Sequence, residues 1–285
     1  MAVPVIDFHV HLGGEGDWKP WLIDWFREST GENWQLIMES MASPENMDRM
    51  LEWSGIDIAV GLAELSPVTT GTVSNEFVAD FCRRSKRLIP FANVNPYLMA
   101  YPARELERYV KEMGFRGLKL YPTYQLFYPN DRLVYPIYAK AEELGIPVML
   151  HTGSSVFKGS RLKYGDPVYL DDVAVDFPDL KILQVHSGRP IWYNTAFFLA
   201  RLHPNVYMEV AGLPPQNLLT YFPELERNVD KIIFGSDWPV ANPKRNVELI
   251  RQLPIAEESK TKILGGNAAR VLGLELQDRD ATPLD

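Results

Sequence analysis

The sequence contains little cysteine, little histidine, no excess of basic charge and no long apolar run. Its 285 residues include a single cysteine, Cys82, so no intrachain disulfide can form and nothing marks an oxidising compartment. The net charge of −8 argues against a nucleic-acid partner and against an anionic membrane surface. No apolar run approaches the ~18 residues of a membrane span, and no cationic leader precedes the first apolar run. We therefore expect a cytoplasmic protein that has neither a membrane nor a nucleic-acid partner.

Short apolar runs alternate with amphipathic segments along the whole chain, which predicts an α/β fold. The eight candidate strands are residues 3–10, 57–63, 88–95, 115–121, 147–152, 181–187, 205–211 and 231–237. Strands that alternate with helices favour parallel pairing and right-handed crossovers. Eight such units in this length predict a closed (β/α)8 TIM barrel in a single domain, residues 1–285. Residues 256–274 are expected to form closing helices, with Asn267 capping the last one.

One segment does not fit a simple barrel. Residues 13–42 form a long connection after the first strand and hold four of the seven tryptophans, namely Trp18, Trp21, Trp25 and Trp34. Long connections in compact domains are usually functional lids or disordered segments, and the apolar content here favours an ordered, lid-like insertion. A helical pair packed on the rim of the barrel is the alternative.

Four of the five histidines, and one aspartate, close predicted strands. His9 and His11 end the first strand, His151 the fifth, His186 the sixth and Asp237 the eighth. Side chains alternate along a strand, so His9 and His11 point to the same face. Active sites of such barrels lie at the C-terminal ends of the strands. These residues therefore predict a pocket for a divalent cation such as zinc. The fifth histidine, His203, falls at the other end of its unit and is interpreted as structural.

Motifs over nearly the whole length resemble those of the amidohydrolase superfamily. The similarity is greatest to its amidohydrolase-related branch (family 2), which includes aminocarboxymuconate-semialdehyde decarboxylase-like and pyrone-dicarboxylate lactonase-like enzymes. The motifs are IDFHVH at 6–11, GFRGLKLYP at 114–122, PVMLHTG at 147–153, VHSG at 185–188, NVYMEVAG at 205–212, IIFGSDWP at 232–239 and GGNAARVLGL at 265–274.

The resemblance implies a role for each of these residues. His9, His11, His151 and Asp237 would bind one divalent metal ion, with zinc expected, and leave one position open as a catalytic site requires. A bound metal lowers the pKa of its water toward ~7. His186 and Asp237 would then be the catalytic residues that exchange a proton with the substrate.

Other residues near the strand ends have more than one interpretation. Lys119 closes the fourth strand, where binuclear relatives carry a carboxylated lysine; it would bridge two metals, bind an anionic substrate group or pair with a carboxylate. Glu209 is a substrate contact, a partner of a metal ligand, or an ion-pair partner of Lys119 or Arg189. Asp7 shares the parity of the first two histidines but lies deeper, which favours a structural hydrogen-bond acceptor.

A basic cluster indicates the charge of the substrate. Lys158, Arg161 and Lys163 follow the fifth strand, and Arg189 follows the sixth, in a chain of net negative charge. Each of the three loop residues alone fits a solvated loop, but together with Arg189 they favour a carboxylate-bearing substrate, because arginine binds carboxylates through a planar fork. The predicted substrate contacts are Lys119, Arg161, Arg189, Glu209 and Trp238.

Three functions remain in comparison. The favoured one is hydrolysis of a C–O or C–N bond of a small, carboxylate-bearing molecule through a metal-activated water. The alternative is metal-dependent, non-oxidative decarboxylation of an aromatic or unsaturated acid. A non-enzymatic barrel that only binds is opposed by the intact ligand set. The expected partner is a small-molecule substrate, and homo-oligomerisation is left open.

Overall fold

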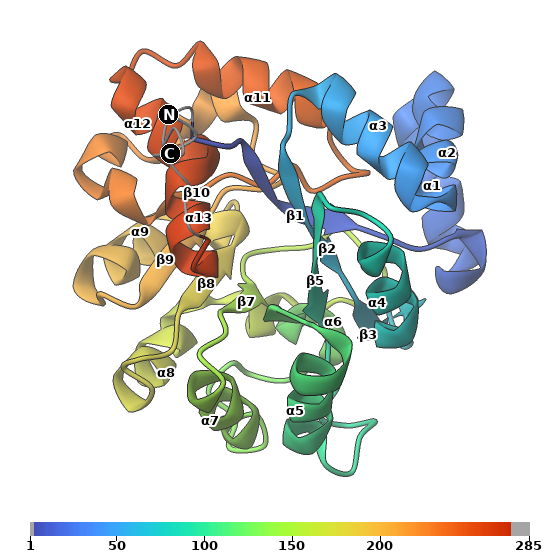
Figure 1. Cartoon of the computed structure of the whole chain (residues 1–285). Coiled ribbons are helices and arrows are strands. Elements are labelled where there is room, and N and C mark those ends of the chain that lie inside the picture. Colours follow the sequence, from blue (N-terminus) through green and yellow to red (C-terminus); the bar gives the residue numbers. More distant parts are fainter. Residues whose placement is uncertain (1–2, 275–285) are drawn as a thin grey trace, which may run out of the picture.

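Eight parallel strands form the centre of the computed structural model, which describes residues 3–274 (Figure 1). Their order around the sheet is β1 (Ile6–His11), β2 (Ile58–Leu62), β5 (Leu88–Ala92), β6 (Gly117–Leu120), β7 (Val148–His151), β8 (Ile182–Val185), β9 (Val206–Glu209) and β10 (Ile232–Ile233). All seven neighbouring pairs are parallel, because each strand follows the previous one through a helical crossover. The predicted TIM barrel is confirmed.

The barrel closes between the first and last strands through backbone hydrogen bonds. The Asp237 amide donates to the His9 carbonyl over 3.0 Å, and the His11 amide donates to the Trp238 carbonyl over 2.9 Å. The last strand itself is shorter than predicted, and residues 234–238 continue beside β1 outside a regular strand, with one isolated bridge between Trp238 and Val10. Closure therefore brings the histidine pair of β1 beside Asp237.

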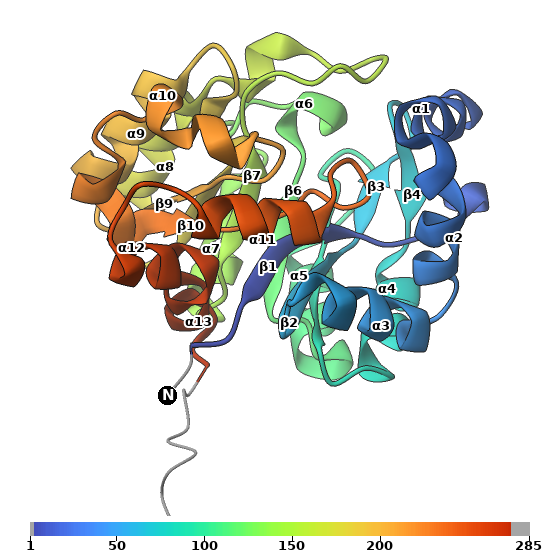
Figure 2. The same cartoon turned by 90° about the horizontal axis from the view of Figure 1, so that it is seen from above.

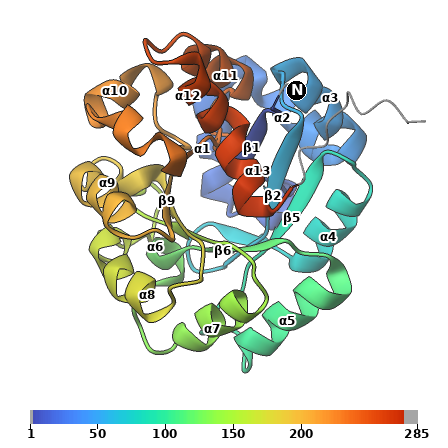
Figure 3. The same ribbon diagram turned by 60° about the vertical axis from the view of Figure 1, so that its left-hand side comes forward.

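Helices surround the strands and follow one another around the barrel (Figure 3). This outer layer contains α3 (Pro44–Ser54), α4 (Asn75–Arg83), α5 (Pro102–Met113), α7 (Tyr135–Glu143), α8 (Leu170–Asp176), α9 (Tyr193–Leu202) and α11 (Pro243–Arg251). Helix α3 begins as its sequence predicts, since the Ser43 hydroxyl accepts from the Asn46 amide over 3.1 Å and Pro44 is the first helical residue. Within residues 3–274, no helix combines the length and the hydrophobicity that a membrane span needs.

The end of the described chain seals the bottom of the barrel. After α12 (Glu257–Thr261) comes a π-helical turn at Lys262–Gly266 and then α13 (Asn267–Leu272). Ala268, Ala269 and Val271 pack against the inward-facing residues of the strands, including Phe8 and Phe91. The predicted cap by Asn267 is wrong: its side-chain amide donates instead to the backbone carbonyls of residues 229 and 232, both at 2.7 Å. The C-terminal ends of the strands are therefore the open end.

The insertion after β1 has two halves with different surroundings. Helix α1 (Pro20–Thr30) lies beside the open end of the barrel, whereas α2 (Trp34–Ala42) packs on α3 (Figure 2). A short antiparallel hairpin, β3 (Glu64–Ser66) and β4 (Gly71–Val73), supports the start of the insertion, and the sequence analysis did not predict it. The Lys19 amide donates to the Thr70 carbonyl over 2.8 Å, and Trp18 pairs with Gly71. The insertion is thus ordered, with α1 at the open end of the barrel and α2 against an outer helix.

A buried carboxylate braces the closure of the barrel. Oδ1 of Asp7 accepts hydrogen bonds from the His9 amide over 3.0 Å and from the Ser236 amide over 2.8 Å. Burial raises the pKa of Asp7 to about 6, although these hydrogen bonds lower it. We predict that Asp7→Ala lowers the free energy of unfolding by about 2–4 kcal/mol, because two buried donors lose their acceptor. Asp7→Asn keeps an acceptor oxygen and should cost clearly less. Urea denaturation of both variants checks this, and equal losses would contradict it.

Candidate metal centre and active site

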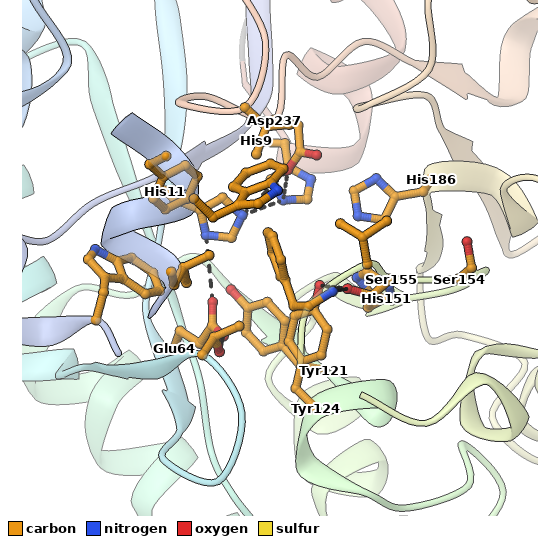
Figure 4. Close-up of a pocket in the computed structure, with 18 of the residues that line it drawn as sticks. His9, His11, Glu64, Tyr121, Tyr124, His151, Ser154, Ser155, His186 and Asp237 are labelled. Atoms are coloured by element: carbon orange, nitrogen blue, oxygen red, sulfur yellow. Dashed lines mark hydrogen bonds and ion pairs between the residues drawn. The ribbon is translucent and has the colours of Figure 1, made fainter. Parts of the chain in front are cut away.

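A cavity of about 200 Å³ opens at the C-terminal ends of the strands (Figure 4). All five residues predicted to be metal-binding or catalytic line it: His9, His11, His151, His186 and Asp237. Helix α1 contributes one wall, with Leu22, Trp25 and Phe26. The lid-like half of the insertion therefore covers a site built from strand ends.

Three potential ligand atoms converge at one side of this cavity. Nε2 of His9 lies 3.2 Å from Nε2 of His11, and these two nitrogens lie 3.4 and 3.5 Å from Oδ1 of Asp237. Two ring nitrogens this close repel each other unless a proton or a cation lies between them. Imidazole nitrogens and a carboxylate oxygen are ligands that zinc and other divalent transition metals accept. The donor set therefore fits a divalent metal.

Glu209 fixes the orientation of His9. Its Oε2 lies 3.4 Å from Nδ1 of His9, and its Oε1 accepts from the Ala211 amide over 3.0 Å. Burial raises the pKa of Glu209 to about 8, although Lys119 lowers it. In its ionised form Glu209 only accepts, which places the hydrogen on Nδ1 of His9 and leaves the lone pair of Nε2 for a metal. Metal-binding histidines commonly have such a carboxylate behind them. Of the interpretations of Glu209, the geometry supports the partner of a ligand, because Glu209 is fully buried and does not line the cavity.

His151 and His186 face the same cavity from the other side. Nε2 of His151 is buried and has no hydrogen-bond partner within the described chain, which leaves it free to bind a metal or a substrate. His151 is not part of the three-atom cluster. Nδ1 of His186 lies 2.7 Å from the Ala211 carbonyl, an acceptor, so Nδ1 carries the hydrogen. Nε2 of His186 is then the only nitrogen of that ring with a lone pair.

Two residues of the cavity have an unusual backbone conformation. The φ angle is 62° at His186 and 67° at Asp237, in the left-handed region that residues other than glycine rarely adopt. Such strain persists only where the surrounding structure holds it, and it clusters at functional sites. His186 directly follows β8, and Asp237 lies near the end of the segment that follows β10. The turn of the backbone at each places its side chain at the open end of the barrel.

Burial decides the charges of these side chains. It lowers the pKa of His9, His151 and His186 well below the usual range, so all three imidazoles are neutral at pH 7. Burial would raise the pKa of Asp237, but His9 and His11 outweigh it and hold that pKa far below its usual range. Neutral imidazoles and an ionised carboxylate are the protonation states that bind metals.

Lys119 is enclosed in the barrel and does not line the cavity. Its Nζ has no hydrogen-bond partner among residues 3–274 and lies 5.0 Å from the centre of the Tyr121 ring. Burial lowers the pKa of Lys119 to about 8, although Glu209 and Asp237 raise it. The predicted direct contact between Lys119 and a substrate is therefore not supported by this geometry.

Of the remaining predicted substrate contacts, some line the cavity and others do not. Arg189 lines the cavity, and its Nη1 donates to the Gly212 carbonyl over 2.7 Å. Arg161 is exposed on the loop after β7 and does not reach the cavity. Trp238 is buried and contributes backbone to barrel closure rather than a cavity wall. The structure thus brings one of the two predicted arginines, Arg189, to the site.

Sequence reasoning missed most of the cavity walls. Tyr121 and Tyr124 follow β6, Ser155 and Phe157 follow β7, and Glu64 directly follows the predicted second strand. Their positions gave a signal, because each comes just after a strand end, where the same rule had identified the histidines. Burial raises the pKa of Glu64, whereas His11 and Thr70 beside it lower it.

The sequence of this barrel matches the family described as amidohydrolase over residues 6–274. The chain belongs to the amidohydrolase family. This confirms the family predicted from the motifs, and it identifies the cavity of this amidohydrolase as a candidate enzyme active site.

Known proteins similar to this amidohydrolase include decarboxylases. A gamma-resorcylate decarboxylase of Polaromonas sp. (strain JS666) is 25% identical over 254 residues, which cover 72% of this chain and 76% of the relative. An uncharacterised TIM-barrel protein from Bordetella bronchiseptica has a TM-score of 0.79 at 26% identity, covering 95% of this chain and 98% of its own. A dihydroxybenzoic acid decarboxylase from Polaromonas sp. JS666, solved with bound manganese, has a TM-score of 0.69 at 20% identity and covers 96% and 98%. These likenesses support the fold over nearly the whole chain.

The ligand cluster of this amidohydrolase predicts stoichiometric metal binding. We expect about one Mn²⁺ or Zn²⁺ per chain in the wild type after dialysis against the metal, and loss of most of it in His11→Ala, because one of the three converging donors is removed. His203→Ala is the matched control, since Nε2 of His203 lies 2.6 Å from Asp171 and away from the cavity. Elemental analysis measures the metal content. Full metal content in His11→Ala would exclude this centre.

Proposed function

We propose that this amidohydrolase is a metal-dependent, non-oxidative decarboxylase of a small aromatic carboxylic acid. The observation that carries the proposal is a cation, Arg189, placed beside the ligand cluster in a cavity with aromatic walls. The similarity to a gamma-resorcylate decarboxylase over 72% of the chain supports it. Hydrolysis of a C–O or C–N bond, which the sequence alone favoured, has less support, since the similar proteins of named activity reported above are decarboxylases.

The walls of the cavity fit a flat ring. The rings of Tyr121 and Tyr124 are nearly parallel, 17° apart, and Trp25, Phe26 and Phe157 face the same space. Aromatic walls bind aromatic ligands through offset-stacked and edge-to-face contacts. The volume of about 200 Å³ is smaller than the roughly 300–1,000 Å³ of pockets for drug-sized ligands. A substrate with one ring is therefore the best fit.

Arg189 gives the cavity its preference for a carboxylate. Gly212 lies between its guanidinium and the Asp237 carboxylate: a Cβ there would come within 2.1 Å of Nη1 of Arg189 and 2.8 Å of Oδ2 of Asp237. One arm of the guanidinium is held by the Gly212 carbonyl, which leaves its other N–H groups for a ligand. A planar guanidinium binds a carboxylate through two parallel hydrogen bonds.

Each residue of the site has its own role in the proposed reaction. The bond between the ring carbon and the carboxylate breaks, its electron pair stays on the ring carbon, carbon dioxide leaves, and a proton takes its place. A divalent metal held by His9, His11, His151 and Asp237 would supply a Lewis acid that binds and polarises substrate oxygens. Arg189 orients the acid, and the aromatic walls exclude water. Nε2 of His186 and the Asp237 carboxylate are the groups that would take up a proton from solvent and pass it to the ring carbon.

The type of product tests the proposal. We expect the protein loaded with Mn²⁺ or Zn²⁺ to release carbon dioxide from hydroxylated benzoic acids, and to lose this activity when a chelator removes the metal. Coupled detection of carbon dioxide, together with chromatography of the ring product, measures the reaction. Turnover of lactones, esters or amides without carbon dioxide release would instead establish the hydrolase.

The two arginines provide a matched comparison. Arg189→Lys should raise KM for the acid about tenfold or more, because an ammonium group cannot reproduce the two parallel hydrogen bonds of a guanidinium. Arg161→Lys should leave KM unchanged, since that side chain is exposed and outside the cavity. Steady-state kinetics of both variants, measured at equal metal content, gives the two KM values. An unchanged KM in Arg189→Lys would show that Arg189 does not bind the carboxylate.

A further inference from the structure

We propose that Glu64 is a positioning residue for the metal ligand His11. It would accept a hydrogen bond from Nδ1 of His11 and thereby direct Nε2 toward the metal. The proposal rests on the metal centre of the proposed function, and it adds to that centre a residue from the β3–β4 hairpin, outside the barrel strands.

The unsatisfied nitrogen of His11 is the first observation. Nε2 of His11 belongs to the three-atom cluster, so a metal there takes its lone pair and Nδ1 must carry the hydrogen. Nδ1 is buried and has no hydrogen-bond partner among residues 3–274. Oε2 of Glu64 lies 3.7 Å from this nitrogen (Figure 4). A buried N–H without an acceptor is costly, and a small approach of these two side chains forms the missing hydrogen bond.

The second observation is that Glu64 is itself held in place. Its side chain is fully buried, and Oε1 accepts a hydrogen bond from the Thr70 hydroxyl across the hairpin. The next residue, Leu65, donates its amide to Oδ1 of Asn93 over 2.9 Å, which ties β3 to the end of β5. One carboxylate oxygen is thus engaged by the hairpin, and the other faces His11.

The third observation is a matching arrangement at the neighbouring ligand. Oε2 of Glu209 lies 3.4 Å from Nδ1 of His9, as Oε2 of Glu64 faces Nδ1 of His11. Each imidazole of the pair therefore has one buried carboxylate behind it, from β9 in one case and from the hairpin in the other. Such carboxylates fix the tautomer and the ring orientation and make the ligand more basic.

The hairpin also connects this ligand to the lid. The Thr70 hydroxyl binds Glu64, while the Thr70 carbonyl accepts from the Lys19 amide at the start of α1. Gly71 permits the close packing, because a Cβ there would lie 2.2 Å from the Asp17 carbonyl oxygen. Orientation of His11 and seating of the lid thus depend on adjacent residues of one hairpin.

The test measures metal affinity rather than turnover. Purified full-length protein is titrated with Mn²⁺, and free Mn²⁺ is followed by electron paramagnetic resonance. Glu64→Gln should raise the Kd for Mn²⁺ about 10- to 100-fold, the usual effect of removing a carboxylate behind a ligating histidine. Thr70→Val should shift the Kd in the same direction by less, because Glu64 remains but loses its restraint. Thr72→Val is the matched control, the same substitution on the exposed face of the same hairpin, and should leave the Kd unchanged.

A second readout separates positioning from folding. The thermal midpoint of the metal-free protein should be similar in wild type and Glu64→Gln, and the stabilisation by added Mn²⁺ should be smaller in the variant. If Glu64→Gln does not fold, Thr70→Val carries the test. Wild-type affinity in Glu64→Gln, or in a folded Thr70→Val when Glu64→Gln fails to fold, would overturn the role of Glu64 alone. Failure of the wild type to bind any divalent metal would overturn the metal centre and both proposals with it.

Discussion

The closure of the barrel between its first and last strands is the constraint on which the site depends. Hydrogen bonds between the backbones of residues 9–11 and 237–238 fix the register, and that register places Asp237 against His9 and His11. Three donor atoms then lie within 3.5 Å of one another in a largely buried place. Lone pairs and a negative charge that lie this close together, and away from water, are favourable only around a proton or a cation. The backbone geometry of the fold therefore creates a site suited to a cation before any substrate is considered.

The sequence predicted the fold and the ligand-type residues for one physical reason. A parallel barrel sends the C-terminal ends of all its strands to one face, so a histidine at such an end can be placed without knowing anything else. The same rule did not decide how far a side chain reaches or which way a loop runs. Lys119 and Trp238 end or follow strands, yet packing encloses both away from the cavity, and the loop that carries Arg161 turns into solvent. Those outcomes depend on tertiary packing that local pattern does not encode.

The cavity walls also depend on tertiary contacts that the sequence pattern does not reveal. The β3–β4 hairpin is too short to produce a recognisable alternation, and its role comes from contacts far away in sequence: Thr70 with Lys19, and Glu64 with His11. The tryptophan-rich insertion was recognised from composition, but composition could not divide it into a helix over the cavity and a helix packed on α3. That division follows from tertiary contacts: the hairpin binds the start of the insertion through Lys19 and Trp18, and α2 packs on α3.

Hydrolysis and decarboxylation require much the same polar residues. The surroundings of those residues must therefore distinguish the two reactions. A hydrolase must admit a water to its reacting centre, whereas a decarboxylase must protect a carbon that holds an electron pair from side reactions until one proton arrives. Here the ligand cluster faces tyrosine, tryptophan and phenylalanine rings under a helical lid, with Arg189 as a cation in the cavity wall. An ionised acid bound there would give up water for the arginine and the metal. Its negative charge stays on the ring carbon when neutral carbon dioxide leaves, and it is neutralised when the proton arrives. An aromatic enclosure around a few fixed charges is suited to that change, because the apolar walls favour the neutral product over the charged carboxylate.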